Sequence, residues 1–409
     1  MSSTDSSGPT TNTRPPEPAQ GQESAAPKKK SLAAFFREDH RYVFLGTSVI
    51  ALIGIWFGRQ PHSEWSFLAH SYAAEFVLYY LMVAWIAVSL VALVNKLLKW
   101  KGDAYAETSP FKKPGAVKIE RYCSYVVWAI ALLFFIDRAV MGTCDLITTS
   151  IAQSKNPQDF LSSSVFMIYN SRAVFLQGIG TTVALALFGT IIAFFLALLL
   201  VFLRIQVIDR TDNDFIRFLK VVGSSFAKIY SAVIRGTPMM IQGLIIYFFG
   251  FSVLRGTGMS VSQISGIWST FTAGLVTISL NSTAYMMEVL RGGIGAVDKG
   301  QTEAARSLGL SQWQAMSKVV FPQGIKNSIP ALSNELVINI KDSSVLSVIG
   351  VVDLMFATTT ISGKYYKQME VYVVAALVYL CLTMIASKLL TMLSKRLEVQ
   401  APGTVPSSN

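Results

Sequence analysis

The sequence has few of the residues on which metal, disulfide or nucleotide chemistry depends. Its three cysteines, Cys123, Cys144 and Cys381, are too scattered for a disulfide framework, and its three histidines stand at no metal-ligand spacing. The pattern Gly-x-x-x-x-Gly-Lys-Ser/Thr, in which a loop cradles nucleotide phosphates, is absent. We therefore predict that this chain is not an enzyme, with no catalytic residue, no metal site and no cofactor of its own.

Charged residues are also scarce. They make up 14% of the 409 residues, whereas hydrophobic residues make up 52%, a balance that is rare in water-soluble proteins of this size. Apolar runs long enough to cross a bilayer recur along the chain. The sequence therefore predicts an all-α, polytopic membrane helical bundle of about eight spans in lipid. We place these spans near residues 42–58, 73–98, 123–141, 174–204, 225–252, 265–290, 330–352 and 370–393.

The net charge of +11 is unevenly distributed along the chain. Positive residues gather before the first span and between the second and third spans, whereas Arg59 and Arg255 follow spans one and five. Because positive residues mark cytoplasmic loops, we expect both termini in the cytoplasm and no nucleic acid partner. Residues 1–40 are predicted to be a disordered cytoplasmic tail, and residues 396–409 a flexible C-terminal tail.

The loop between spans six and seven has the pattern of a short helical hairpin. Asp298 and Gln301 have a capping-box spacing, and good helix formers follow until Gly309. A second capping box at Ser311 opens another short helix, which should end before Pro322. An amphipathic hairpin between membrane spans fits a docking element for another protein. An ordinary connecting hairpin fits these local features equally well, because caps and glycines occur in any loop between helices.

The spacing within this hairpin resembles the coupling-loop signature of ABC importer permeases. The signature reads Glu-Ala-Ala, three residues, Gly, nine residues, an aliphatic residue, one residue, a large apolar residue and Pro. The matching residues are Glu303, Ala304, Ala305, Gly309, Val319, Phe321 and Pro322. Further motifs over residues 170–395 resemble the polar amino acid branch of that family, which takes up histidine, glutamate, glutamine, arginine or opines. These motifs are Arg235-Gly236-Thr237-Pro238 with Gln242, Ala284-Tyr285 with Glu288, Arg291-Gly292-Gly293-Ile294, Gly300-Gln301, Pro322-Gln323, Asn334 and Lys341-Asp342-Ser343-Ser344.

The resemblance implies a type I ABC importer transmembrane fold. Residues 171–395 would form a permease core of about five spans, and residues 41–170 an N-terminal membrane extension of about three. Hairpin 298–322 would dock into a cytoplasmic ABC ATPase dimer, which uses ATP and Mg²⁺. The implied coupling residues are Glu303, Ala304, Ala305, Gly309 and Pro322. A second permease subunit, the same chain or a sister chain, and an extracytoplasmic solute-binding protein are further implied partners in a bacterial inner membrane.

Polar residues inside the spans predict a substrate pathway, because such groups are costly in lipid and face the bundle interior or water. An amino acid needs an anionic partner for its ammonium group and a cationic or amide donor for its carboxylate. The predicted pathway residues are Asn281, Tyr285, Glu288, Asn339, Lys341 and Asp342. A purely structural role also fits some of them, since Glu288 stands three residues before Arg291, an ion-pair spacing.

Arg235, Gly236 and Pro238 predict a hinge at the start of span five, because the proline frees a backbone carbonyl and the glycine permits close helix approach. A packing kink without motion fits the same residues. Two other functions compete with the permease subunit, namely a stand-alone secondary transporter or channel for small polar solutes and a membrane scaffold. The sequence leaves open which amino acid is moved and whether the permease pair is homodimeric or heterodimeric.

Overall fold

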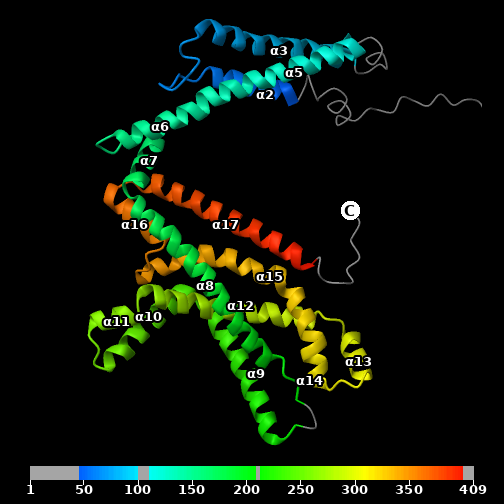
Figure 1. Ribbon diagram of the computed structural model, residues 1–409, viewed down its shortest axis with the longest axis vertical. Coiled ribbons are helices and arrows are strands. Elements are labelled where there is room, and N and C mark those ends of the chain that lie inside the picture. The colour runs from blue at the N-terminus through cyan, green and yellow to red at the C-terminus, as the bar shows by residue number, and fades with distance from the viewer. Residues whose placement is uncertain (1–45, 100–109, 209–211, 399–409) are drawn as a thin grey trace, which may run out of the picture. The chain divides into compact units, whose positions relative to one another are not determined.

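The computed structural model describes residues 46–99, 110–208 and 212–398 (Figure 1). Every regular element in this part of the chain is a helix, which confirms the all-α prediction. The predicted tail 1–40 and most of the tail 396–409 lie outside the described residues. The chain divides into two compact units, Met1–Asp145 and Leu146–Asn409. The functional boundary that we placed between residues 170 and 171 stays a prediction.

The helices of the first unit pack through small residues. They are α2 (Gly46–Gly58), α3 (Tyr72–Lys99), a 3₁₀ turn (Pro110–Lys112), α5 (Pro114–Phe135), a π-helical turn (Ile136–Val140) and the start of α6 (Met141–Ala152). A Cβ atom on Gly54 of α2 would lie 2.6 Å from Met82 Sδ and 3.0 Å from Ala131 Cβ. Glycine at this position therefore lets α2 approach both α3 and α5.

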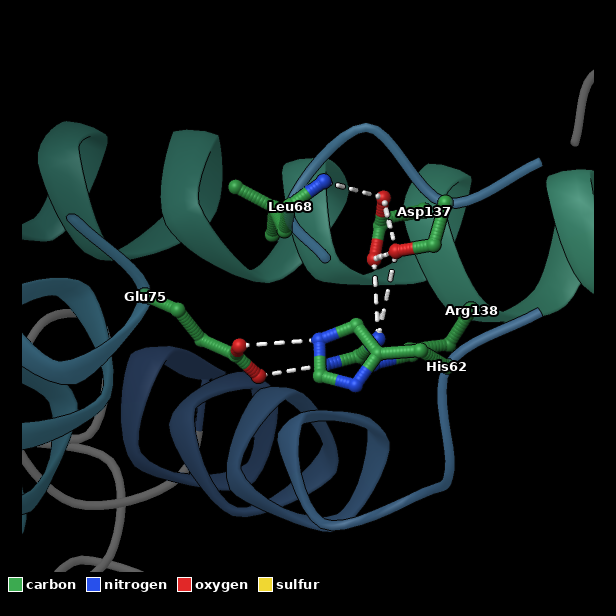
Figure 2. Close-up of polar contacts among 6 residues, drawn as sticks. His62, Leu68, Glu75, Asp137 and Arg138 are labelled. Carbon is green, nitrogen blue, oxygen red and sulfur yellow. Dashed lines mark hydrogen bonds and ion pairs between the residues drawn. The ribbon is translucent and has the colours of Figure 1, made fainter. Parts of the chain in front are cut away.

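Figure 2 shows a polar cluster in the first unit, centred on the π-helical turn after α5. Asp137 is fully buried and accepts hydrogen bonds from Ser66 Oγ at 2.8 Å and from the backbone N–H of Leu68 at 3.1 Å. Its Oδ2 also lies 3.2 Å from Nη1 of the neighbouring Arg138. The carboxylate is thus held by one charge and by two donors from the loop between α2 and α3.

Arg138 extends the cluster to α3. Its side chain is 1% exposed, donates to Glu75 and lies with Nη2 2.8 Å from His62 Nε2. A buried charge is costly unless it is paired, so these contacts stabilise both Asp137 and Arg138 inside the unit. The helical span runs on past these two charged residues, from Pro114 to Ala152, so our prediction that the third span would end at residue 141 was wrong.

The second unit contains the remaining helices. They are α7 (Phe160–Asn170), α8 (Arg172–Arg204), α9 (Asp214–Arg235), α10 (Met239–Gly256), α11 (Val261–Ile267), α12 (Thr270–Gly295), α13 (Lys299–Ser307), α14 (Gln312–Ala315), a π-helical turn (Met316–Val320), α15 (Phe321–Asp342), a 3₁₀ turn (Ser343–Ile349), α16 (Leu354–Tyr365) and α17 (Gln368–Glu398). Several begin at a side chain that accepts a hydrogen bond from the first turn, as helix N-termini require. These caps are Asp159, Asn213, Ser260, Ser269, Asp298, Ser311 and Asp353.

Helix α12 is central to the second unit and packs against α8, α9, α10 and α15 (Figure 1). The approach of α12 to α15 depends on glycine. A Cβ atom on Gly324 of α15 would lie 2.6 Å from Ile294 Cα, and one on Gly293 of α12 would lie 2.7 Å from the Gly324 carbonyl oxygen. Small residues of this kind let membrane helices approach closely.

The spans differ from the predicted eight. Among the described residues, five helices are long and apolar enough to cross a membrane, or six if the bent pair Gln312–Ile349 and Leu354–Tyr365 is one span. The predicted first span is only the 13-residue α2. The predicted span 225–252 is two helices, α9 and α10, because the chain breaks before Pro238. The predicted span 265–290 begins only at Thr270, and α12 carries too many buried polar residues to count as an apolar span.

The polar cluster yields a test of stability in the first unit. Arg138→Ala would leave Asp137 and Glu75 without their cation, and removing one partner of a buried pair costs about 3–5 kcal/mol. We expect a clear fall in the thermal unfolding midpoint of the detergent-purified protein. Lys118→Ala, which removes an exposed cation from α5, is the control and should leave the midpoint near the wild-type value. Equal midpoints for the two variants would show that the cluster adds no stability.

Candidate functional site

A pocket of about 350 Å³ opens between the start of α10, the middle of α12 and the second half of α15. The pocket residues of α15 share one helix face, because Ile338, Asn339 and Asp342 follow Glu335 by three, four and seven residues. The residues that line the pocket are Thr237, Pro238, Met239, Asn281, Ser282, Tyr285, Glu335, Ile338, Asn339 and Asp342. Polar side chains dominate this lining, which is unusual for a space between membrane helices.

One wall of the pocket is the break between α9 and α10. Gln242 holds this break, because its Nε2 donates to the carbonyl oxygens of Ile234 at 2.7 Å and Thr237 at 2.9 Å. The same amide accepts through Oε1 from Asn281 Nδ2 of α12 at 3.0 Å. The Ile234 carbonyl, which lacks a helical donor because Pro238 stands four residues later, and the loop carbonyl of Thr237 are therefore both satisfied by a side chain, and the break is joined to α12.

A second set of polar contacts, made by the lining residue Asn339, joins three helices at the pocket. Asn339 of α15 accepts from Ser282 Oγ of α12 at 2.7 Å and donates through Nδ2 to Thr190 Oγ1 of α8 at 2.9 Å. All the polar atoms of this amide side chain face protein, since Asn339 is 2% exposed. Asn339 thus fixes the position of α15 against α8 and α12.

The predicted pathway residues fall into two groups. Asn281, Tyr285, Asn339 and Asp342 line the pocket together. The other two do not line it. Glu288 accepts from Arg291 Nε at 2.7 Å and from Ser231 Oγ at 3.3 Å, which matches the ion-pair alternative, and Lys341 has an exposed side chain.

Glu335 lines the pocket but was absent from the predicted pathway residues. The sequence reasoning placed it only among the polar residues of the seventh span. The signal that would have found it is its helical spacing, four residues before Asn339 and seven before Asp342, on the face that carries both.

The predicted hinge residues lie at the helix break. Arg235 ends α9, Gly236 caps it, and Pro238 precedes the first residue of α10. The guanidinium carbon of Arg235 lies 5.4 Å from the ring centroid of Tyr285, within the range of a cation–π contact. Whether the break moves stays a prediction, because the same contacts suit a fixed kink.

The hairpin between α12 and α15 forms as two short helices joined at Gly309. This glycine has φ +85°, a left-handed conformation that residues with a Cβ atom rarely adopt. The reciprocal capping box predicted at Ser311 is formed with Gln314. The box predicted at Asp298 is not formed, because the Asp298 carboxylate accepts from Gly300 N at 2.6 Å and not from Gln301.

One of the implied coupling residues, Ala305, does not lie on the surface of the hairpin. Glu303 and Ala304 are exposed, but Ala305 is 4% exposed and packs inward. The largest exposed apolar side chains on the hairpin are Leu308, at 83%, and Trp313, at 51%. Sequence reasoning passed over these two residues because the signature leaves their positions free.

Pro322 also behaves differently from the prediction. The second helix of the hairpin does not end before it, since α14 continues through the π-helical turn into α15. Pro322 is the second residue of α15 and directly follows the π-helical turn, in which the Phe321 N–H donates to the Met316 carbonyl oxygen and the backbone departs from regular α-helix. The hairpin and the pocket-lining helix are therefore continuous.

The contacts of Asn339 yield a test. Asn339→Leu keeps a side chain of similar size but leaves the buried Ser282 hydroxyl without its acceptor, at about 1–3 kcal/mol for an unsatisfied buried group. Thr190 loses its donor from Asn339 but still donates to the Ala186 carbonyl oxygen. We expect a lower thermal unfolding midpoint in detergent. Asn334→Leu, on an exposed position of the same helix, serves as the matched control. A variant at Asn339 that is as stable as the one at Asn334 would rule out this role.

The hairpin and the helices that line the pocket lie within a region that matches a known protein family. Residues 224–399 match the family model described as "binding-protein-dependent transport system inner membrane component". The chain is 40% identical over 175 residues to a putative glutamine transport system permease protein of Rickettsia bellii, covering 42% of this chain and 75% of that protein. It is 31% identical to a nopaline transport system permease protein of Agrobacterium fabrum over 250 residues, 59% of this chain and 97% of the relative.

Two further matches each cover more than half of this chain. An arginine transport system permease protein of Bacillus subtilis is 35% identical over 223 residues, 54% of this chain and 90% of the relative. A chain in the crystal structure of an amino acid ABC transporter with histidines is 36% identical, with a TM-score of 0.47 over 59% of this chain and 99% of that one. On the sequence matches, the chain belongs to the family of inner membrane permease components of binding-protein-dependent ABC transport systems.

Proposed function

We propose that this chain forms the translocation pathway of an ATP-driven importer for polar amino acids. The observation that carries the proposal is the combination of a polar pocket inside the bundle with an exposed helical hairpin that continues into a helix lining that pocket. The relatives named above, which are described as permeases for glutamine, arginine and nopaline transport, support the substrate class.

The pocket supplies suitable chemistry for such a solute. Carboxylates of Glu335 and Asp342 accept hydrogen bonds from an ammonium group, while the second amide hydrogen of Asn281 and the hydroxyl of Tyr285 are donors for a carboxylate. The pocket is lined by residues of three separate helices, so a change in the angle between them alters its opening. In this proposal, Glu288 and Lys341 contribute at the mouth of the pathway and not inside the pocket.

The hairpin 298–322 is the proposed contact with a cytoplasmic ABC ATPase dimer. Glu303 and Ala304 form an exposed surface with one charged and one small side chain. The left-handed conformation of Gly309 fixes the bend of the hairpin next to the exposed Leu308. Ala305 and Pro322 support this surface from within, Ala305 by packing inward and Pro322 by its place in the first turn of α15. ATP and Mg²⁺ act on the ATPase, and closure of its two subunits displaces the hairpin.

The remaining assembly follows from the same proposal. A second permease subunit, identical or a sister chain, completes the pathway, and a solute-binding protein delivers the amino acid from outside. The chain lies in the bacterial inner membrane with both termini in the cytoplasm. In this scheme, the break at Arg235, Gly236 and Pro238 is the hinge about which α10 reorients. None of the relatives named above is described as a stand-alone transporter, which disfavours the secondary-transporter alternative.

The conformation of Gly309 gives a test of coupling. Gly309→Val places a β-branched residue at φ +85°, which costs about 1–2 kcal/mol and changes the bend of the hairpin. We expect solute-stimulated ATP hydrolysis of the reconstituted complex to fall severalfold while the protein stays in the membrane. Gly258→Val is a matched control, since Gly258 has the same φ of +85° and neither glycine has a neighbour within 4 Å of an added Cβ. Full coupling in Gly309→Val would contradict the docking role.

The proposed side of the hairpin is testable by chemical labelling. In a variant whose three cysteines are replaced by serine, Leu308→Cys adds a thiol on a residue that is 83% exposed. A membrane-impermeant maleimide should label it in inside-out vesicles and not in right-side-out vesicles. Tyr366→Cys, at a 93% exposed residue on the proposed outer side, should show the opposite pattern. Labelling of the cysteine at position 308 in right-side-out vesicles would contradict the cytoplasmic position of the hairpin.

A further inference from the structure

A groove of about 330 Å³ lies between α15 and α17, which pack side by side in the second unit (Figure 1). This α15–α17 groove shares no lining residue with the pocket described above. Its lining includes the hydroxyl side chains of Ser333, Ser387, Thr391 and Ser394 and, among the residues described there, no carboxylate. Polar groups between membrane helices are costly unless a partner satisfies them, so the groove invites a guest.

Most of the hydroxyls in the groove have no partner in the protein. A serine or threonine inside a helix often donates to a carbonyl oxygen one turn earlier, as Thr391 does to the Ser387 carbonyl oxygen at 2.8 Å. The hydroxyls of Ser333, Ser387 and Ser394 form no hydrogen bond with a described residue. The groove therefore offers three hydrogen-bond donors to a guest that carries several acceptors.

Exposed lysines stand beside the groove on both helices. Lys388 directly follows Ser387 on α17, and Lys326 lies one helical turn before Pro330, which belongs to the lining on α15. Neither lysine forms an ion pair with a described residue. Free hydroxyl donors with cations beside them suit a phosphate group, and basic sites between membrane helices on the cytoplasmic side bind anionic lipid headgroups.

The position of the groove along α17 matches the edge of a bilayer. Ser387 lies about 29 Å from the first residue of α17 at 1.5 Å per residue, close to the ~30 Å thickness of the hydrocarbon core. On the same face, one and two turns nearer to the start of α17, Met384 is 62% exposed and Leu380 is 54% exposed. This face thus changes from apolar side chains to hydroxyls in the order of acyl chains and headgroup.

We infer that the α15–α17 groove binds a phospholipid with an anionic headgroup. Its phosphate accepts hydrogen bonds from the serine hydroxyls, and its acyl chains lie along Leu380 and Met384. A zwitterionic lipid fits less well, because its headgroup brings a cation towards Lys326 and Lys388. The inference rests on the proposed function only for the side of the membrane. Since the hairpin leads into α15, the groove lies at the cytoplasmic leaflet.

The test titrates the detergent-purified full chain with dioleoylphosphatidylglycerol or dioleoylphosphatidylcholine and measures bound lipid by native mass spectrometry. Ser387→Phe fills the groove, and Lys388→Gln removes a cation while keeping a side chain of similar length. The matched controls are Ser225→Phe and Lys228→Gln, at exposed positions of α9. Thermal unfolding midpoints show which variants are folded, and Lys388→Gln decides the question if Ser387→Phe is not.

Wild type and both controls should retain phosphatidylglycerol and bind phosphatidylcholine more weakly. Lys388→Gln should weaken phosphatidylglycerol binding about fivefold, the effect of one lysine near an anionic lipid, and Ser387→Phe should abolish the binding that the wild type shows in excess of phosphatidylcholine. No lipid on the wild type, equal binding of the two lipids, or wild-type binding in both groove variants would overturn the inference.

Two further arms identify other occupants. Inorganic phosphate should not displace phosphatidylglycerol, because it lacks acyl chains, and full displacement would show that the groove recognises a free anion. A wild-type dimer that carries no lipid and dissociates in Ser387→Phe would assign the groove to a second copy of the chain. Neither arm requires transport, so an absence of amino acid uptake by the reconstituted complex would overturn the proposed function and leave the lipid result standing.

Discussion

Polar groups inside a hydrocarbon layer have no water to bond with, and the architecture of this chain follows from that constraint. Gln242 supplies donors to the carbonyls that the α9–α10 break exposes, and Asn339 connects three helices through one amide. In the first unit, Asp137 and Arg138 are buried because each satisfies the other and the loop before α3 adds the remaining donors. The polar residues that are paired within the chain maintain the structure. The buried Glu335 forms no hydrogen bond or ion pair with a described residue, and it lines the pocket.

Local features were the most predictable from sequence. The turn at Gly309, the capping box at Ser311 and the helical hairpin itself depend on residues close together in the chain, so propensity and spacing were sufficient. The spans were less predictable because a hydropathy window measures apolar content, and α12 is buried among helices where small and polar residues replace apolar ones. Pro322 was misjudged for a similar reason. A proline disrupts a regular α-helix, but here a π-helical turn directly precedes Pro322 and the helix continues through it.

The sequence predicted some of the residues that line the pocket and missed others. Asn281, Tyr285, Asn339 and Asp342 were found because intramembrane polar residues at helical spacing share a face. Glu288 and Lys341 satisfied the same rule of composition, yet the first pairs with Arg291 and the second is exposed, which only three-dimensional contacts reveal. Glu335 shows the converse, since it lines the pocket at a helical spacing from Asn339 and Asp342 that the sequence displays but the predicted set left out.

The continuity of the hairpin with α15 has a mechanical consequence. The 22 residues of α15 form a rod about 33 Å long, with Pro322 in its first turn and the acidic face near its far end. Pro330 is the one proline between them, and helices kink at prolines in their interior. Under the proposed function, a displacement of the hairpin would therefore reach the pocket through one continuous helix, since α14 runs on into α15, which lines the pocket.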